Sequence, residues 1–424
     1  MIKNIDKFIF NNDKNIDSQS ATWNLVASLL NALTSAYLLL FITRYISIEA
    51  GGVFVIASTL AYQMLTIGNY SMRNYQATDT LNKFTFKEYL LSRYITSILM
   101  ALVSVSIIIF NGYDISKSLI ILSFILFKWI DAIEDVYHGF YQQHNRLDVA
   151  CRAQSIRYIL SLIFFSICII IFKDLLISCF GTFVFSFLIF LFINNIIKKK
   201  FKFEKTYNKK NIFKLLIECF PLFIGSYLYL YLCNSPKYAI DTVLNDTAQS
   251  YFGIIFMPVF IINLISTLIY RPLLTKMANT WNSGKKKNLI HSITKQLTII
   301  FIITIIATII GYLCGTQILG LIYAVDLNQY KLALAILMIG GGLNAIVGYF
   351  LSIITIIRAQ KTIIPGYALV SLAAFLFSNY VTKNYQINGA SILYVLLLLL
   401  LSIYFILIFI HIYNKNVDKR KAKI

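Results

Sequence analysis

The sequence predicts an all-α integral membrane protein with about twelve transmembrane helices, and three observations lead to this class. Hydrophobic residues make up 58% of the 424 residues, and charged residues only 13%, against about 25% in a soluble domain. The apolar residues occur in runs of about 20, the length that crosses roughly 30 Å of hydrocarbon as a helix. The runs are apolar on nearly every side, as in residues 392–410, whereas strands of a membrane barrel would alternate with a period of two.

Short polar stretches between the runs give the position of each helix. The fifth and sixth runs are separated only by Lys173 and Asp174, which predicts a tight hairpin there. We expect spans at residues 21–43, 51–68, 89–110, 118–138, 156–172, 175–197, 212–233, 249–270, 293–313, 332–356, 362–380 and 389–412.

The distribution of lysine and arginine predicts the side of the membrane that each loop faces. With the N-terminus in the cytoplasm, 27 of the 38 basic residues fall on inside segments and six on outside segments. One miscounted helix would exchange the inside and outside assignments of all later loops and remove this bias. We therefore expect both termini in the cytoplasm. Richness in Ile, Lys, Asn and Phe is typical of an AT-rich, bacterial genome, which points to a bacterial inner membrane. Membrane topology also explains the net charge of +20, so we expect no nucleic-acid partner.

The longest polar segment divides the predicted chain into halves. Its sequence is KKKFKFEKTYNKKN, with seven lysines. Weak similarities between the halves recur in the same order, as expected for two parallel lobes related by an axis along the membrane normal. The expected parts are a cytoplasmic tail at 1–20, a six-helix lobe at 21–197, the basic linker at 198–211, a second six-helix lobe at 212–412 and a basic cytoplasmic tail at 413–424.

The fourth predicted span holds the densest group of ionisable residues, FKWIDAIEDVYHGFYQQ. On a helix, Lys128, Asp131, Glu134, Asp135 and His138 share a stripe about 120° wide. Ionisable residues inside a bilayer are costly and face the bundle interior or water by default. One interpretation is a hydrated cavity wall, where Lys128 binds an anionic substrate and the carboxylates take part in ion coupling. The other is internal neutralisation, with Lys128 paired to Asp131 at i,i+3.

Further candidates lie at the ends of other spans. Glu218 precedes Pro221 by one turn, and the proline would bend the helix. This carboxylate is either a further ion-coupling residue or a hydrated residue beside a structural kink. Arg44 and Lys237 at outer ends, and Arg271 at an inner end, are candidates to line a passage for an anionic headgroup. Their alternative role is that of interfacial anchors.

The sequence contains no catalytic, metal-binding or nucleotide-binding motif. The four histidines are dispersed, the six cysteines lack metal-ligand spacing, and no P-loop is present. No outer loop is long enough to hold an active site of its own. We therefore expect no catalytic residues, no metal and no cofactor.

Five stretches together resemble a known family. They are NLVASLLNALTSAYLLLFITRYI, NYSMRNYQATD, EDVYHGFYQQHNRLDVA, NSPKYAIDTVLNDTAQSYFGIIFMP and IYRPLLTKMANTW, in this order between residue 24 and about residue 360. The chain resembles the polysaccharide repeat-unit flippases (O-antigen and capsule translocases) of the multidrug/oligosaccharidyl-lipid/polysaccharide (MOP) exporter superfamily. The resemblance implies a MATE-like, V-shaped pair of six-helix bundles around a central cavity, alternating access, and cationic residues that hold a lipid pyrophosphate.

The resemblance also implies a substrate and partners. The substrate would be an undecaprenyl-pyrophosphate-linked oligosaccharide, moved for O-antigen, capsule or a related surface polysaccharide. Other expected partners are membrane lipids and the polymerase and chain-length regulator of the pathway. Three alternatives remain open: a multidrug or organic-cation exporter of the same superfamily, a peptidoglycan-precursor flippase, and a membrane-embedded polymerase or transferase of the same pathway. The expected substrate-binding residues are Lys128, Arg44, Lys237 and Arg271, and the expected ion-coupling residues are Asp131, Glu134, Asp135 and Glu218.

Overall fold

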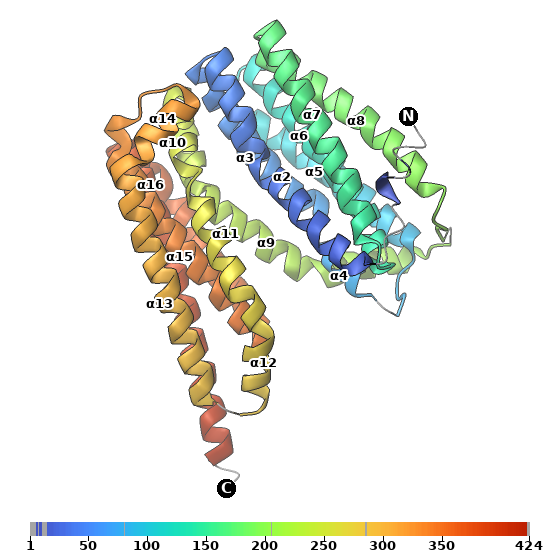
Figure 1. The fold of residues 1–424 in the computed structure, drawn as a ribbon, viewed down its shortest axis with the longest axis vertical. Coiled ribbons are helices and arrows are strands. Elements are labelled where there is room, and N and C mark those ends of the chain that lie inside the picture. Colours follow the sequence, from blue (N-terminus) through green and yellow to red (C-terminus); the bar gives the residue numbers. More distant parts are fainter. Residues whose placement is uncertain are drawn as a thin grey trace. The chain divides into compact units, whose positions relative to one another are not determined.

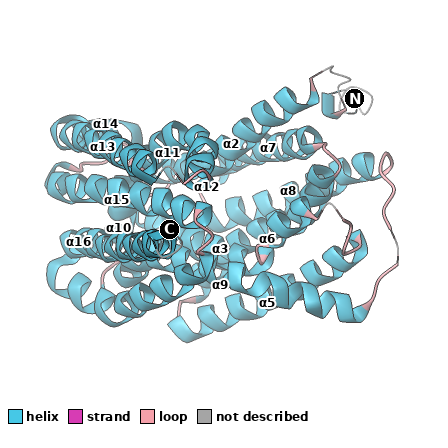
Figure 2. Ribbon diagram, turned by 90° about the horizontal axis from the view of Figure 1, so that it is seen from below, coloured by secondary structure: helices cyan, strands magenta, loops and turns pink. Residues whose placement is uncertain are grey.

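The computed structural model confirms an all-α membrane protein. It describes Asp6 and residues 8–10, 15–79, 81–204, 206–284 and 286–421. Within these ranges every regular element is a helix, and Figure 2 shows helices joined by loops. The chain divides into two compact units, Met1–Tyr227 and Leu228–Ile424, with the boundary inside one helix. Several basic residues of the expected tails and loops lie outside the described residues: Lys3, Lys7, Lys14, Lys205, Lys285 and Lys423.

The first unit is built from long helices joined by short turns (Figure 1). Lys173 has a left-handed backbone with a φ of 49°, and the Asp174 side chain caps the next helix by accepting from the backbone N–H of Ile177. The hairpin predicted at these two residues is therefore present. The helices are α2 (Ile16–Tyr45), α3 (Ile48–Asn69), α4 (Met72–Thr78), α5 (Phe86–Asn111), α6 (Ile115–Gln143), α7 (Leu147–Phe172), α8 (Leu175–Lys198) and the first part of α9 (Lys209–Val243).

The second unit contains more interruptions than the sequence predicts. The span expected at 249–270 is divided at Met257 and Pro258, because proline has no N–H for the helical ladder. The elements are the rest of α9, α10 (Asp246–Phe256), α11 (Val259–Tyr270), η1 (Arg271–Leu273), α12 (Leu274–Asn282), α13 (Lys286–Ile310), the π-helical turn η2 (Gly311–Gly315), α14 (Thr316–Tyr323), η3 (Asn328–Tyr330), α15 (Lys331–Ile356), η4 (Gln360–Thr362) and α16 (Ile363–Lys421).

The number of membrane-spanning helices agrees with the sequence. Ten segments of the described residues are long and apolar enough to cross a membrane. Helix α6 is not among them, because Lys128 and several carboxylates interrupt its apolar stretch. One of the ten, Gln360–Asn414, contains two helices that meet at Gln386, where φ is 49° and ψ is −138°. Adding α6 and dividing this segment gives the twelve predicted spans within the described residues.

Helices α6 and α15 lie at the centres of their units. Helix α6 packs against α3, α4, α5, α7 and α8, and α15 packs against α10, α11, α12, α13 and α16. Each is the fourth of the predicted spans in its half, which is the arrangement that a repeat would produce. Their interiors differ, because α6 carries charged residues whereas α15 carries Gly340, Gly341 and Gly342. A Cβ atom on Gly342 would lie 2.2 Å from Thr304 Oγ1, so this glycine permits a close helix contact.

Candidate functional site

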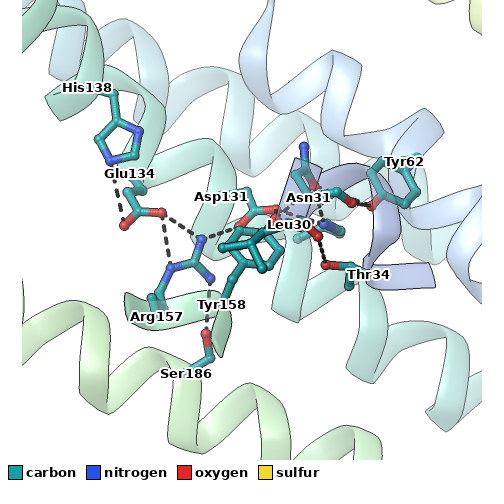
Figure 3. A network of polar contacts seen from close by, with 11 residues as sticks. Leu30, Asn31, Thr34, Tyr62, Asp131, Glu134, His138, Arg157, Tyr158 and Ser186 are labelled. Carbon is teal, nitrogen blue, oxygen red and sulfur yellow. Dashed lines mark hydrogen bonds and ion pairs between the residues drawn. The ribbon is translucent and has the colours of Figure 1, made fainter. Parts of the chain in front are cut away.

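A network of buried polar and charged side chains occupies the interior of the first unit (Figure 3). Helix α6 supplies the charged residues predicted from its sequence, and the neighbouring helices supply their partners. The network consists of Asn31 of α2, Tyr62 of α3, Lys128, Asp131, Glu134 and His138 of α6, Arg157 and Tyr158 of α7, and Ser186 of α8.

Lys128 is fully buried and its ammonium group is surrounded by partners. Its Nζ atom donates to Asp131 Oδ2 at 3.0 Å, to the Tyr158 hydroxyl at 3.0 Å and to Asn31 Oδ1 at 3.3 Å. It also lies 4.4 Å from the centroid of the Tyr62 ring, a favourable cation–π position. An ammonium group has three donors, so all of them are used in this state. The pairing with Asp131 that the i,i+3 spacing allowed is present.

Arg157 bridges the carboxylates of Asp131 and Glu134. Its Nε and Nη2 atoms donate to Glu134 Oε2 at 3.0 Å and 2.6 Å, and Nη2 also donates to Asp131 Oδ1. Its Nη1 atom donates to Ser186 Oγ at 3.0 Å. Figure 3 shows the guanidinium group between the two carboxylates. Two cations and two carboxylates make this part of the network electrically neutral, which offsets much of the cost of burial.

Glu134 differs from Asp131 in the partners of its second oxygen. Asp131 Oδ2 lies 2.6 Å from the Tyr158 hydroxyl and 3.0 Å from Lys128 Nζ, and Oδ1 accepts from Arg157, so both oxygens are held by strong donors. Glu134 Oε1 instead lies 3.7 Å from Nε2 of His138. This oxygen of Glu134 therefore faces a histidine side chain rather than a lysine or arginine.

Asp135 belongs to a separate cluster. Its Oδ2 atom accepts from Arg93 Nη2 at 2.7 Å, and its Oδ1 atom lies 3.4 Å from Arg73 Nη1. Arg93 is fully buried and also donates to the carbonyl of Gly68, while Arg73 Nε donates to Gln142 Oε1 at 3.3 Å. The stripe predicted on the fourth span therefore serves two clusters, one towards α7 and α8 and one towards α4 and α5.

Glu218 lies near the surface of the first unit and not in the buried network. Lys83 Nζ lies 2.8 Å from both carboxylate oxygens, and the Tyr75 hydroxyl donates to one of them. The Lys83 and Glu218 side chains are 42% and 27% exposed. The hydrogen bond to Glu218, followed by the one to Tyr75, raises the pKa of Lys83 above its ordinary value. Lys83 therefore stays protonated at neutral pH, and this pair connects the α4–α5 loop to α9.

The other predicted cations do not belong to the network. Arg44 is exposed at the end of α2, and Arg271 is exposed in η1 of the second unit. Lys237, half-buried in the second unit, has its Nζ atom 4.5 Å from the centroid of the Phe256 ring. The structure thus brings together Lys128, Asp131 and Glu134 among the predicted site residues.

Sequence reasoning missed Arg157 and Arg93 as members of these clusters. Both belong to the few basic residues that fall on neither the inside nor the outside segments. A charged residue within an apolar run requires a partner in the bundle interior, and this rule could have paired them with the surplus of carboxylates on the fourth span. Among the described residues, no group of three or more His, Cys, Asp or Glu could hold a metal ion.

The fold of the chain is similar to the folds of several solved membrane proteins. The structure is similar to an inward-facing multidrug resistance MATE family transporter of the MOP superfamily, with a TM-score of 0.68, 11% identity and coverage of 91% of this chain and 96% of that chain. It is similar to the lipid II flippase MurJ, with a TM-score of 0.70, 15% identity and coverage of 93% and 89%. It is also similar to the Vibrio cholerae MATE transporter VcmN, with a TM-score of 0.62, 14% identity and coverage of 99% and 98%.

These structural similarities establish the fold, and the sequence comparison establishes the family. Among curated proteins, none matches the chain in sequence. The family model for polysaccharide biosynthesis proteins matches residues 18–278, which is more than half of the chain. This match includes the whole buried network of α6. The chain therefore has a MATE-like fold and belongs to the polysaccharide biosynthesis protein family.

Proposed function

We propose that the protein is a flippase that moves undecaprenyl-pyrophosphate-linked oligosaccharide repeat units from the cytoplasmic to the outer leaflet of a bacterial inner membrane. The observation that carries this proposal is the match to the polysaccharide biosynthesis family on a fold shared with a lipid II flippase. A sugar headgroup cannot cross hydrocarbon unaided, whereas a polyprenyl tail can remain in lipid. The product would supply O-antigen, capsule or a related surface polysaccharide. In this proposal the protein makes and breaks no covalent bond.

The residue roles in this proposal start from the candidate residues predicted from the sequence. The pyrophosphate is anionic, and we assign its contacts to Arg44, Lys237 and Arg271, with Lys128 joining them only when it leaves Asp131. Among the candidate coupling carboxylates, Glu134 is the best placed, because one of its oxygens faces His138 rather than a permanent cation. All four carboxylates, Glu134 included through Arg157 at its other oxygen, are held by a lysine or arginine. A coupling role therefore requires such a pair to separate.

The pairing of the α6 carboxylates favours a flippase over an organic-cation exporter. An exporter of cations needs a carboxylate that can receive the substrate. Asp131 and Glu134 are both contacted by Arg157, and Asp135 is contacted by Arg93. These carboxylates are therefore neutralised within the first unit and offer little free negative charge to a cationic drug.

A deletion strain tests the proposal. Removal of the gene should abolish the surface polysaccharide and cause lipid-linked repeat units to accumulate on the cytoplasmic face of the membrane, and the wild-type gene should restore export. A polymerase defect would instead leave single repeat units on the outer surface. A strain that retains normal polymer and becomes sensitive to drugs would show that the protein is an exporter. The pathway's polymerase and chain-length regulator are the expected protein partners, and co-purification would test them.

A further inference from the structure

The linker between α8 and α9 is strongly basic and lies between two membrane spans. Helix α8 ends at Lys198 and α9 begins at Lys209, so the connecting residues lie next to the membrane surface. The described part of this segment contains one acidic residue, Glu204, and six lysines: Lys198, Lys199, Lys200, Lys202, Lys209 and Lys210.

Two aromatic residues fix the linker to the first unit. Phe203 packs against Phe86 and Phe140, with ring centroids 4.6 Å and 4.7 Å apart, and Phe201 lies 4.8 Å from the ring of Tyr141. Both phenylalanine side chains are half-buried, while Lys202 between them is exposed. The lysines are thus presented by an anchored segment.

Residues 206–211, which lead into α9, are held by hydrogen bonds to the beginning of α5. The Glu88 carboxylate accepts from the backbone N–H of Asn208 at 2.8 Å and from the Asn211 side chain at 2.9 Å. The Thr85 hydroxyl donates to the carbonyl of Thr206 at 2.9 Å. Glu88 and Thr85 also form the capping box of α5. The beginning of α9 and the lysines on it are therefore positioned by the end of a neighbouring span.

Only part of the positive charge is neutralised within the protein. Lys200 forms an ion pair with Asp6 at 2.6 Å, and Lys198 lies over the ring of Tyr137 at 4.6 Å. The four remaining lysines are exposed and form no ion pair within the described residues; they are Lys199, Lys202, Lys209 and Lys210. Tyr207 is exposed between them, and an exposed tyrosine is typical of the lipid headgroup level.

We propose that Lys199, Lys202, Lys209 and Lys210 form a binding surface for the headgroups of anionic phospholipids in the leaflet that the linker faces. Clusters of four to eight basic residues next to a transmembrane helix attract anionic lipids, and each lysine near the surface contributes about fivefold in affinity. A role in membrane topology requires the lysines to be present but not to be held in fixed positions. The packing of Phe201 and Phe203 and the hydrogen bonds of Glu88 hold the segment that carries them in place.

Lipid retention by the full-length protein tests this surface. The protein, purified in detergent, is mixed with equal amounts of phosphatidylglycerol and phosphatidylcholine, and the retained lipids are counted by native mass spectrometry. Wild type should retain phosphatidylglycerol preferentially. Replacement of the four lysines by glutamine should reduce this preference at least about fivefold, whereas replacement by arginine should preserve it. The matched control changes four lysines at predicted outer ends by the same charge: Lys117, Lys173, Lys331 and Lys383→Gln.

Each outcome of this experiment supports or overturns the proposal. The preference of the wild type should fall as salt is raised, because exposed charges are screened. A glutamine variant that melts like wild type and keeps its preference overturns the proposal, and so does an equal loss in the control. If inorganic pyrophosphate stabilises the wild type against heat and the glutamine variant loses only this effect, the surface binds free phosphate groups and not phospholipid.

Discussion

Two nitrogen atoms of Arg157 converge on one carboxylate oxygen of Glu134, at 3.0 Å from Nε and 2.6 Å from Nη2, inside the first unit. Both side chains are buried. The pair therefore connects α6 and α7 at a depth where neither charge could be hydrated. A buried pair of this kind contributes little net stability relative to an apolar pair, but the loss of one partner leaves an uncompensated charge. The dependence of folding on Arg157 should consequently be strong.

Arg157→Gln should lower the stability of the first unit by about 3–5 kcal/mol and reduce the amount of protein in the membrane. Its removal leaves Asp131 paired with Lys128 and leaves Glu134 without its cation. The double variant Arg157→Gln with Glu134→Gln restores neutrality and should recover most of the abundance. Fluorescence-detected size-exclusion chromatography after stepwise heating measures both quantities.

The exposed pair of Lys83 and Glu218 is the matched control for this experiment. Lys83→Gln also removes one partner of an ion pair, but both side chains are partly exposed, so the remaining charge can be hydrated. Its abundance and melting behaviour should remain near those of the wild type. If Lys83→Gln and Arg157→Gln lose abundance and thermal stability equally, burial of the Arg157 pair is not the cause of the loss.

Substitutions of Lys128 should separate a structural role from a role in transport. Lys128→Arg retains the charge and should retain substantial transport. Lys128→Gln should lose transport, and membrane abundance must be measured beside it, because Asp131 loses one of its two cations. The double variant Lys128→Gln with Asp131→Asn restores neutrality. Full transport by the double variant would show that Lys128 is only an ion-pair partner and does not act on the substrate.

Much of the fold could be predicted because a bilayer restricts what a chain can do. Apolar runs of sufficient length must be helices, and the charge bias of the loops predicts their orientation. The hairpin at Lys173 and Asp174 was predicted because no other polar residues separate the two runs. The division of the eighth span at Met257 and Pro258 was not predicted, since proline inside a span is compatible with either a kink or a break.

The candidate site could be predicted only in part. The helical period placed Lys128, Asp131 and Glu134 on one side of α6, and the structure brings them together. The same period grouped Asp135 with them, although Asp135 pairs with Arg93 of another helix. A helical wheel describes one helix at a time. It does not show which neighbouring helix packs against each part of the polar stripe on α6. The partners on α5 and α7 therefore required the structure.

Gly342 of α15 should be intolerant of substitution in the second unit. A Cβ atom there would lie 2.2 Å from Oγ1 and 2.8 Å from Cβ of Thr304. Because Thr304 Cβ is bonded directly to the backbone of α13, it cannot move away by a side-chain rotation. Helices α13 and α15 would therefore have to move apart. Gly342→Ala should therefore lower abundance and melting temperature, as expected for an overpacked interior, with a cost of about 1–3 kcal/mol.

Gly225→Ala is the control for Gly342→Ala. A Cβ atom at Gly225 of α9 would have no neighbour within 4 Å, and alanine is a better helix former than glycine by about 1 kcal/mol. This variant should be at least as stable as the wild type. A tolerant Gly342→Ala would mean that α13 and α15 pack less closely than the structure shows.

Membrane topology is the prediction on which the function most depends, because a flippase must present its two ends to different compartments. Reporter fusions should give cytoplasmic signals near residues 205 and 420 and external signals near residues 112 and 240. Gly112 ends α5, and Ile240 lies in the last turns of α9, so both positions are close to helix ends. Neutralising the linker lysines should weaken the orientation without reversing it, since the remaining loops keep the same charge bias. An external signal at residue 205 would contradict two parallel halves with six spans each.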